Sequence, residues 1–324
     1  MRLFAAVVVT ICSLACDDSD VSAEGEGEGE PAEGEGEGEG EIASPRFIAV
    51  GYGGRRLTSA DGSAWGNDVA VVEGGGDDDN LLRGVCAHDG VVLAVGGSGH
   101  GVVRRSIDGG ESWTTTVNDA RGWIGACAFN HDGVAVFVGS ARSSRSVDGG
   151  VTLIDHENRF YAGGNWQMRD VIVVDDTFVA VGDLGVSNSV DGINWTDPAG
   201  PRNLSRAAHG NGHTVVVGGA LHAHSTDLTT WTETAHGGVG DIVFADGGFL
   251  IVGEGFDLSS VDGVEFVQHA QPAMSRVAVG VVDGASVYVG INYPDVRRTS
   301  SDGRTWSEPI RDDKNAIDDL LFVP

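Results

Sequence analysis

The stretch Ser106-Ile107-Asp108-Gly109-Gly110-Glu111-Ser112-Trp113 decides the fold, because similar stretches recur along the chain. Each copy has a Ser-x-Asp triplet, followed four or five residues after the aspartate by tryptophan, phenylalanine or leucine. The seven aspartates are Asp61, Asp108, Asp148, Asp191, Asp227, Asp262 and Asp302. Their spacing of 35 to 47 residues is the size of one four-stranded propeller blade. The sequence therefore predicts seven repeated units, and we call the repeated stretch the Ser-x-Asp tract.

Short apolar runs that end in glycine precede the tracts, for example Val92-Leu-Ala-Val-Gly96 and Phe178-Val-Ala-Val-Gly182. Apolar runs of this length are typical of strands that are buried on both faces. Another strand pattern precedes each run except the first, with an Asp, Asn or Gly turn between the two, and a further strand pattern follows each tract. Each unit is therefore expected to contain four strands, a to d, with the Ser-x-Asp tract at the c–d hairpin.

The two ends of the repeated region complement each other. The first unit lacks strand a, because the chain enters at Phe47, and the segment 317–323 has the strand-a pattern without a strand b after it. Pairing these ends removes the open sheet edges. We therefore predict an all-β fold: a seven-bladed β-propeller of four-stranded antiparallel blades over residues 46–324, closed by the C-terminal strand, which completes the first blade.

The repeated tract resembles the Asp-box, or BNR repeat, of sialidases, the sortilin ectodomain, some glycoside hydrolases and the photosystem II assembly-factor family. The resemblance covers nearly all of residues 46–324. It implies that the seven aspartates are structural and that a functional site lies on the opposite face of the propeller. The physical role fits, since an aspartate can accept backbone N–H bonds across a hairpin and an aromatic residue can pack between blades.

The N-terminal region has the features of an export signal and a tether. Residues 1–16 combine Arg2 with a short apolar run, and Ser13-Leu14-Ala15-Cys16 resembles the lipobox of bacterial lipoproteins. We expect lipidation at Cys16, with plain secretion as the alternative. Residues 17–45 contain nine glutamates, mostly in Glu-Gly pairs, and no basic residue, so we predict a disordered acidic tether.

The charge of the chain limits its partners. There are 48 acidic and 20 basic residues, which gives a net charge of −28 at pH 7. Nucleic acid is excluded as a partner, because its binding depends on neutralising phosphates with Lys and Arg. No cofactor motif or metal-ligand spacing occurs, so neither a cofactor nor a metal is expected.

The start of strand a should line the mouth of the propeller, the end at which the b–c and d–a loops lie. Aligning the units gives two sets of residues that ring this mouth. The first set is Arg83, Ile124, Arg169, Ser205, Gly240, Ser275 and Asp318. The second is Gly84, Gly125, Asp170, Arg206, Asp241, Arg276 and Asp319. The candidate ligand-binding residues here are Arg83, Arg169, Asp170, Arg206, Asp241 and Arg276, and mutual neutralisation of Arg and Asp is the structural alternative.

Aromatic and cysteine residues complete the set of candidates. Tyr161 and Trp166 lie in one loop and could form a stacking platform for a sugar or a protein, whereas Trp123 aligns with large core residues. Cys86 and Cys127 align at equivalent positions of adjacent blades. Equivalent side chains point in the same sense around the ring, so we expect two buried thiols and no disulfide.

These observations favour a binding or scaffold module for a glycan or protein over an enzyme, because no catalytic constellation is recognisable. The alternative is a sialidase-like or other glycoside hydrolase that uses carboxylates and arginines at the mouth. We expect a monomer that contacts the membrane through its lipid anchor alone. The expected location is the bacterial cell envelope, at the outer membrane or cell surface, or else the periplasm or the medium.

Overall fold

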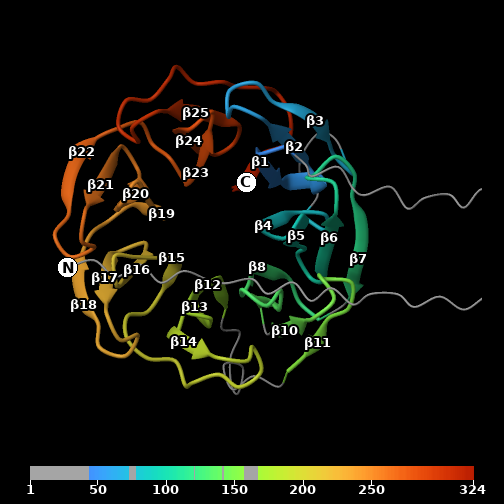
Figure 1. Ribbon diagram of the computed structural model, residues 1–324, viewed down its shortest axis with the longest axis horizontal. Helices are drawn as coiled ribbons and strands as arrows, with labels where there is room; N and C mark the ends of the chain where they lie inside the picture. Colours follow the sequence, from blue (N-terminus) through green and yellow to red (C-terminus); the bar gives the residue numbers. More distant parts are fainter. Residues whose placement is uncertain (1–43, 73–77, 120, 141, 157–166) are drawn as a thin grey trace, which may run out of the picture. The chain divides into compact units, whose positions relative to one another are not determined.

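The computed structural model describes residues 44–72, 78–119, 121–140, 142–156 and 167–324. Within these ranges the strands form seven antiparallel sheets, arranged as blades in a ring (Figure 1). The predicted seven-bladed propeller is therefore confirmed. The predicted signal segment and tether lie outside the described residues. No helix in the described ranges has the length and apolar character needed to cross a bilayer.

We number the blades from the N-terminus. Blade 1 contains β26 (Ile317–Val323), β1 (Arg46–Gly51), β2 (Arg56–Ser59) and β3 (Gly66–Val69), with the 3-10 turn η1 (Tyr52–Gly54) between β1 and β2. Blade 2 contains β4 (Leu82–His88), β5 (Val91–Gly96), β6 (Gly101–Ser106) and β7 (Thr114–Asp119). Blade 3 contains β8 (Ile124–Phe129), β9 (Ala135–Gly139), β10 (Arg142–Ser146) and β11 (Ile154–Asp155).

The remaining four blades follow in the order of the sequence. Blade 4 contains β12 (Met168–Val174), β13 (Thr177–Gly182) and β14 (Gly185–Ser189). Blade 5 contains β15 (Leu204–Gly210), β16 (His213–Gly218), β17 (Leu221–Ser225) and β18 (Thr232–Ala235). Blade 6 contains β19 (Val239–Ala245), β20 (Gly248–Gly253), β21 (Phe256–Ser260) and β22 (Val267–Ala270). Blade 7 contains β23 (Arg276–Val282), β24 (Ala285–Asn292) and β25 (Val296–Ser300).

Blades 4 and 7 have three strands, where four were expected in every blade. In each, the outer segment makes a single bridge, between Val186 and Ala199 in blade 4 and between Arg297 and Ile310 in blade 7. A proline directly precedes the bridging residue in both segments, at Pro198 and Pro309. Because proline has no N–H to donate, it interrupts the hydrogen-bond ladder of the outer strand.

The ring is closed by β26, which pairs with β1 in antiparallel register, with Phe47 opposite Phe322. The predicted closure by the C-terminal strand is confirmed. The apolar core lies between neighbouring blades: the cluster between blades 7 and 1, for example, contains Phe47, Val289 and Leu320 and packs against Trp65. The aromatic residue or leucine that ends each Ser-x-Asp tract packs against one of these clusters.

The strand directions define two ends of the ring. Strand a of every blade starts at the mouth, and strand c ends at the opposite end, which we call the hairpin face. The strand β1 runs from Arg46, opposite Val323 at the hairpin face, to Gly51, opposite Ile317 at the mouth. The described chain therefore enters the ring from the hairpin face.

Candidate functional site

The inner strands place one residue of each blade at the same level of the mouth. Gly84, Ala126, Asp170, Arg206, Asp241, Arg276 and Asp319 each lie opposite a valine or isoleucine of the neighbouring strand b. The predicted alignment is correct except in blade 3, where it is one residue out. Ile124 lies opposite Gly139 as Leu82 lies opposite Gly96, so Gly125 and Ala126 take the places predicted for Ile124 and Gly125.

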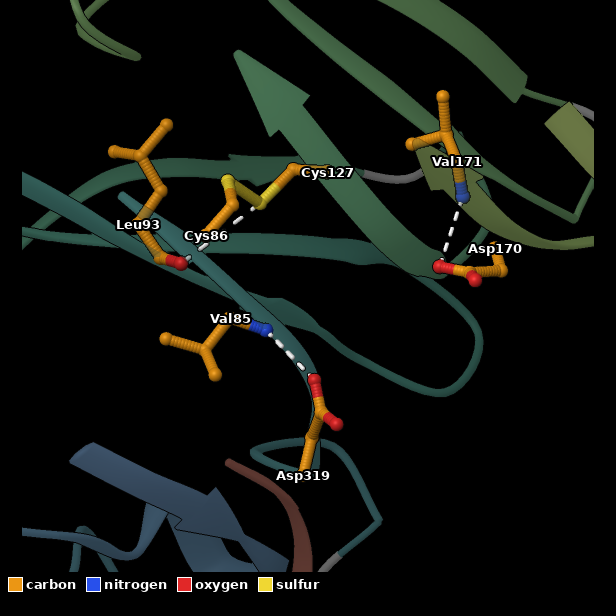
Figure 2. The surroundings of a disulfide bond; sticks show 7 residues. All are labelled: Val85, Cys86, Leu93, Cys127, Asp170, Val171 and Asp319. Atoms are coloured by element: carbon orange, nitrogen blue, oxygen red, sulfur yellow. Dashed lines mark hydrogen bonds between the residues drawn. A yellow bond between two sulfur atoms is a disulfide. The ribbon is translucent and has the colours of Figure 1, made fainter. Parts of the chain in front are cut away.

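Three aspartates of this level connect neighbouring blades through backbone hydrogen bonds. Asp170 accepts N–H bonds from Val171 of its own strand at 2.9 Å and from Ala207 of blade 5 at 3.0 Å. Asp319 likewise accepts the N–H of Val85 in blade 2 at 3.0 Å (Figure 2). Both oxygens of Asp170 are thus occupied, which disfavours it as a catalytic acid or nucleophile.

Asp241 repeats this arrangement between blades 6 and 7. Its two carboxylate oxygens accept the N–H groups of Ile242 and Val277, both at 2.9 Å. The residue is 6% exposed. We call this contact, in which an aspartate accepts the N–H of the next blade, a carboxylate clamp. Asp170 and Asp241, the two mouth carboxylates named for the hydrolase alternative, therefore have a structural role in which each carboxylate oxygen accepts a backbone N–H bond.

Arg206 and Arg276 lie among these carboxylates without close ion pairs. Arg206 Nε is 3.7 Å from Asp241 Oδ1, and Arg276 Nε is 3.8 Å from Asp319 Oδ1. Charge-assisted hydrogen bonds are usually 2.7–2.9 Å long, so these pairs are loose. Each guanidinium donates instead to a nearby backbone carbonyl: Arg206 to Ser205 at 2.9 Å and Arg276 to Ser275 at 2.7 Å. Some N–H groups of both guanidiniums therefore remain available to donate to another molecule.

The low exposure of the cluster shifts its pKa values. Burial raises the pKa of Asp319 to about 7, although Arg206 and Arg276 oppose this. Burial also raises the pKa of Asp170. For Arg206, burial opposes the charged form, but Asp170, Asp319 and Asp241 outweigh it and raise the pKa. The pKa of Arg276 is lowered by burial and by the neighbouring Arg206.

A cavity of about 190 Å³ lies at this level, lined among others by Asp170, Arg206, Asp241, Asp319 and Cys127. Pockets for small-molecule ligands usually measure about 300–1,000 Å³. The cavity is thus too small for a typical cofactor or an oligosaccharide, and it can accept a side chain or another small group. No cluster of three or more His, Cys, Asp or Glu suited to a metal ion occurs in the part of the chain that the structure describes.

Arg83 and Arg169 are placed differently from the central pair. The Arg83 guanidinium lies 4.9 Å from the centre of the Trp123 ring, and its Nε donates to Gly97 at 3.0 Å. Arg169 is exposed and pairs with Asp183 at 3.0 Å. The expectation that Trp123 is a core residue is wrong, because Ile124 takes the core position with 0% exposure. The candidates Tyr161 and Trp166 lie outside the described residues.

The expectation of two free thiols is also wrong, because Cys86 and Cys127 form a disulfide with a Cα–Cα distance of 5.8 Å (Figure 2). The cysteines are not equivalent in register. Cys86 lies opposite Leu93, three residues before the glycine that ends strand b of its blade, whereas Cys127 lies opposite Phe137, only two residues before the corresponding glycine. Since side chains alternate along a strand, this offset turns the two Cβ atoms toward each other. Counting from strand b rather than from strand a is the sequence signal that could have found the bond.

The Ser-x-Asp tracts lie at the hairpin face, at the other end from this cluster. In blade 1, Asp61 accepts N–H bonds from Ser63 and Ala64, both at 2.8 Å, and the hydroxyl of Ser59. The bond from Ala64 and the other donors lower the pKa of Asp61 to about 2. The other six aspartates make the same kind of hairpin contact. These carboxylates hold the hairpins in shape.

The comparisons with known proteins find the fold alone. No protein-family model matches the chain, and no curated protein does. A solved structure of YCF48 bound to a D1 peptide is similar, with a TM-score of 0.57 at 18% identity, covering 77% of this chain and 88% of that chain. A computationally designed protein, Ika8, gives 0.56 at 13% identity over 84% of this chain and 88% of its own.

A third similar structure is that of PorZ, a bacterial surface component of the type-IX secretion system of Porphyromonas gingivalis. The TM-score is 0.52 at 12% identity, over 71% of this chain and 33% of that one. At these identities the likeness shows a shared propeller architecture. A shared architecture does not by itself indicate a function.

Proposed function

We propose that this chain is a protein-binding scaffold module of the bacterial cell envelope, anchored by lipid at Cys16, which holds its partner at the mouth. The observation that carries this proposal is that carboxylates at the mouth hold neighbouring blades together. Asp170 and Asp241 accept backbone N–H bonds at both carboxylate oxygens, so these two side chains hold blades together and are poorly suited to act as the acid and nucleophile of a glycoside hydrolase.

The positions of the chain entry and of the arginines agree with a binding role. The described chain enters the ring at the hairpin face, the opposite end from the mouth. Arg206 and Arg276 have donors to spare beside a cavity that fits one side chain, and Arg83 with Trp123 adds residue types common at protein interfaces. YCF48, whose structure contains a D1 peptide, and the surface component PorZ share the propeller architecture, which makes a protein partner preferable to a glycan.

Site-specific photocrosslinking tests the proposal. A photoreactive amino acid replaces Arg169 at the mouth or, as the control, Arg304 at the hairpin face, both of which are exposed. In cells, a discrete crosslinked protein from position 169 and none from position 304 is the expected result. Equal yields from both positions, or none from either, contradict it. Turnover of fluorogenic sialosides or other glycans that Arg206→Gln abolishes, with folding intact, would favour the hydrolase alternative.

A further inference from the structure

Two arginines lie close together at the junction of blades 1 and 2. Arg56 begins β2 of blade 1, and Arg104 lies in β6 of blade 2, the third strand of each blade (Figure 1). Arg56 Nε donates to the carbonyl of Gly54 at 2.9 Å, and Arg104 Nη2 donates to Asn80 Oδ1 at 3.2 Å. A Cβ atom at Gly54 would lie 3.5 Å from the backbone oxygen of Asn80. The two guanidiniums are therefore bonded to neighbouring residues of adjacent blades.

Neither arginine has an acidic partner within the described ranges, although acidic residues outnumber basic ones by 48 to 20 in the whole chain. Arg55, one residue before Arg56, shows the contrast: it pairs with Asp68 at 2.8 Å and with Asp312 at 2.6 Å. Burial and the charge of Arg104 lower the pKa of Arg56 to about 10, and burial lowers the pKa of Arg104. No carboxylate offsets either shift. Two positive charges thus lie together without a counter-ion from the described chain.

The Arg56 side chain is packed into the fold, yet its end reaches solvent. The residue is 9% exposed, and its guanidinium carbon lies 6.0 Å from the centre of the Trp113 ring. Nη1 and Nη2 of Arg56 have no hydrogen-bond acceptor among the described residues, and neither is one of the unbonded atoms that are sealed from solvent, as Arg104 Nε is. Thr115, which accepts a bond from Arg104 Nη1 at 2.8 Å, is exposed. A solute can therefore reach the free donors of Arg56 without opening the core.

The charge and the donors of this pair select the chemistry of a ligand. Guanidiniums bind carboxylates and phosphates through paired N–H bonds. A phosphate monoester carries a charge of about −1.5 to −2 at pH 7, which matches two arginines, whereas a carboxylate would leave one of them uncompensated. Repulsion from the acidic surface of the chain is screened beyond about 8 Å at physiological ionic strength.

We propose that Arg56 and Arg104 form a binding site for a phosphate-type dianion, either free phosphate or the phosphate group of a monoester. The anion accepts N–H bonds from Nη1 and Nη2 of Arg56 and compensates the charge of Arg104 from the neighbouring blade. Because both blades then interact with one anion, binding should stabilise their junction. The site does not include Arg206 or Arg276, so its test is independent of the function proposed for the mouth.

Isothermal titration of the full-length protein with phosphate tests this inference, with chloride added to keep the ionic strength constant. One phosphate per chain is expected, and Arg104→Gln should weaken its binding by about tenfold or more. The matched control is Arg105→Gln, which removes the same charge from the next residue of β6, whose Nε donates to Gly149 of blade 3 at 2.9 Å. This control should change the affinity by less than about twofold. Arg56→Gln removes the free donors and should abolish binding.

Two further ligands distinguish the possible sources of the anion. Glycerol 3-phosphate that binds as tightly as phosphate assigns the site to monoesters, such as a headgroup or a phosphorylated partner. Binding that is about tenfold weaker assigns the site to the free ion. Acetate should bind about tenfold more weakly than phosphate, because one arginine stays uncompensated.

Three results would overturn the inference. Without saturable binding of phosphate there is no site. If acetate binds as tightly as phosphate, the pair does not select a dianion. If Arg104→Gln and Arg105→Gln weaken binding equally, the attraction is a general effect of charge. Should Arg56→Gln fail to fold, the comparison of Arg104→Gln with Arg105→Gln decides.

Discussion

The mouth of this propeller has a charged arc and an uncharged arc, and they stay together by different means. In blades 4 to 7 and blade 1, Asp and Arg alternate around the ring, and the carboxylates bind the backbone of the next blade. In blades 2 and 3, Gly84 and Ala126 let the inner strands approach, and a disulfide connects them. The same geometric task is thus performed by polar contacts in one arc and by a covalent bond in the other.

The largest expected effect comes from removing the disulfide. The variant Cys86→Ala/Cys127→Ala frees a loop between residues 41 positions apart, for which chain entropy predicts a loss of about 4 kcal/mol in the free energy of unfolding. Denaturant unfolding of the variant and of the oxidised and reduced wild type provides the measurement. The reduced wild type should match the variant. A loss below about 1 kcal/mol would show that other contacts hold the uncharged arc.

The matching test in the charged arc is Asp241→Ala. It leaves the N–H groups of Ile242 and Val277 without their acceptor and removes a negative charge close to Arg206, so we expect a loss of about 3 kcal/mol in the free energy of unfolding. The control Asp313→Ala removes an exposed carboxylate in the loop ahead of β26 and should change stability by less than about 0.5 kcal/mol. Similar losses for the two variants would mean that the clamp contributes nothing special.

Gly84 tests whether the uncharged arc depends on close approach. A Cβ atom at this position would come within 2.8 Å of the carbonyl oxygen of Gly125, so Gly84→Ala must push β4 and β8 apart. We expect a loss of about 2 kcal/mol in unfolding free energy. In the control Gly99→Ala the new methyl group meets nothing within 4 Å. An equal effect of both substitutions would refute the close-approach argument.

The smallest expected effect, counted per pH unit, is a pH dependence in the charged arc. The pKa of Asp319 is raised to about 7 in the folded protein, above its unfolded value of about 3.9. The folded state therefore binds more protons between these pH values, and the contribution of Asp319 to stability falls as the pH rises from about 4 to 7. The slope is at most about 1.4 kcal/mol per pH unit.

The variant Asp319→Asn should remove this slope. The buried His222 acts in the opposite sense, since burial lowers its pKa to about 4 and its contribution rises with pH up to about 6.5. The difference in unfolding free energy between variant and wild type, measured from pH 4 to 8, isolates Asp319. A difference that does not depend on pH would show that Asp319 stays ionised in the folded protein.

The sequence predicted the number of blades and the closure of the ring because both follow from repetition. Seven tracts count the blades, and an unpaired strand pattern at each end implies that the ends pair. The convergence of Arg206, Asp241 and Arg276 also followed from aligned repeats. What an alignment does not provide is the partner of each side chain, so the clamps to backbone N–H groups were not foreseen.

The errors arose where turn lengths differ between blades. In blade 3 the turn between β8 and β9 spans Asn130 to Val134, whereas in blade 2 only Asp89 and Gly90 separate the strands. An alignment carried through strand a cannot tell how these extra residues shift the register. Because of this one-residue error, Trp123 was predicted at the core position that Ile124 occupies. The same error also reversed the prediction for the cysteines, because a shift of one residue turns every side chain to the other face.

The position of β1 has a mechanical consequence. The strand begins at the hairpin face, where the chain enters, and ends at the mouth, and it is paired with β26 on one side and β2 on the other. Inter-strand hydrogen bonds lie perpendicular to the strands. A pull on the start of β1 that is resisted at the mouth loads both rows of bonds in shear and at the same time. The ring is thus built to transmit tension along its axis without being unzipped.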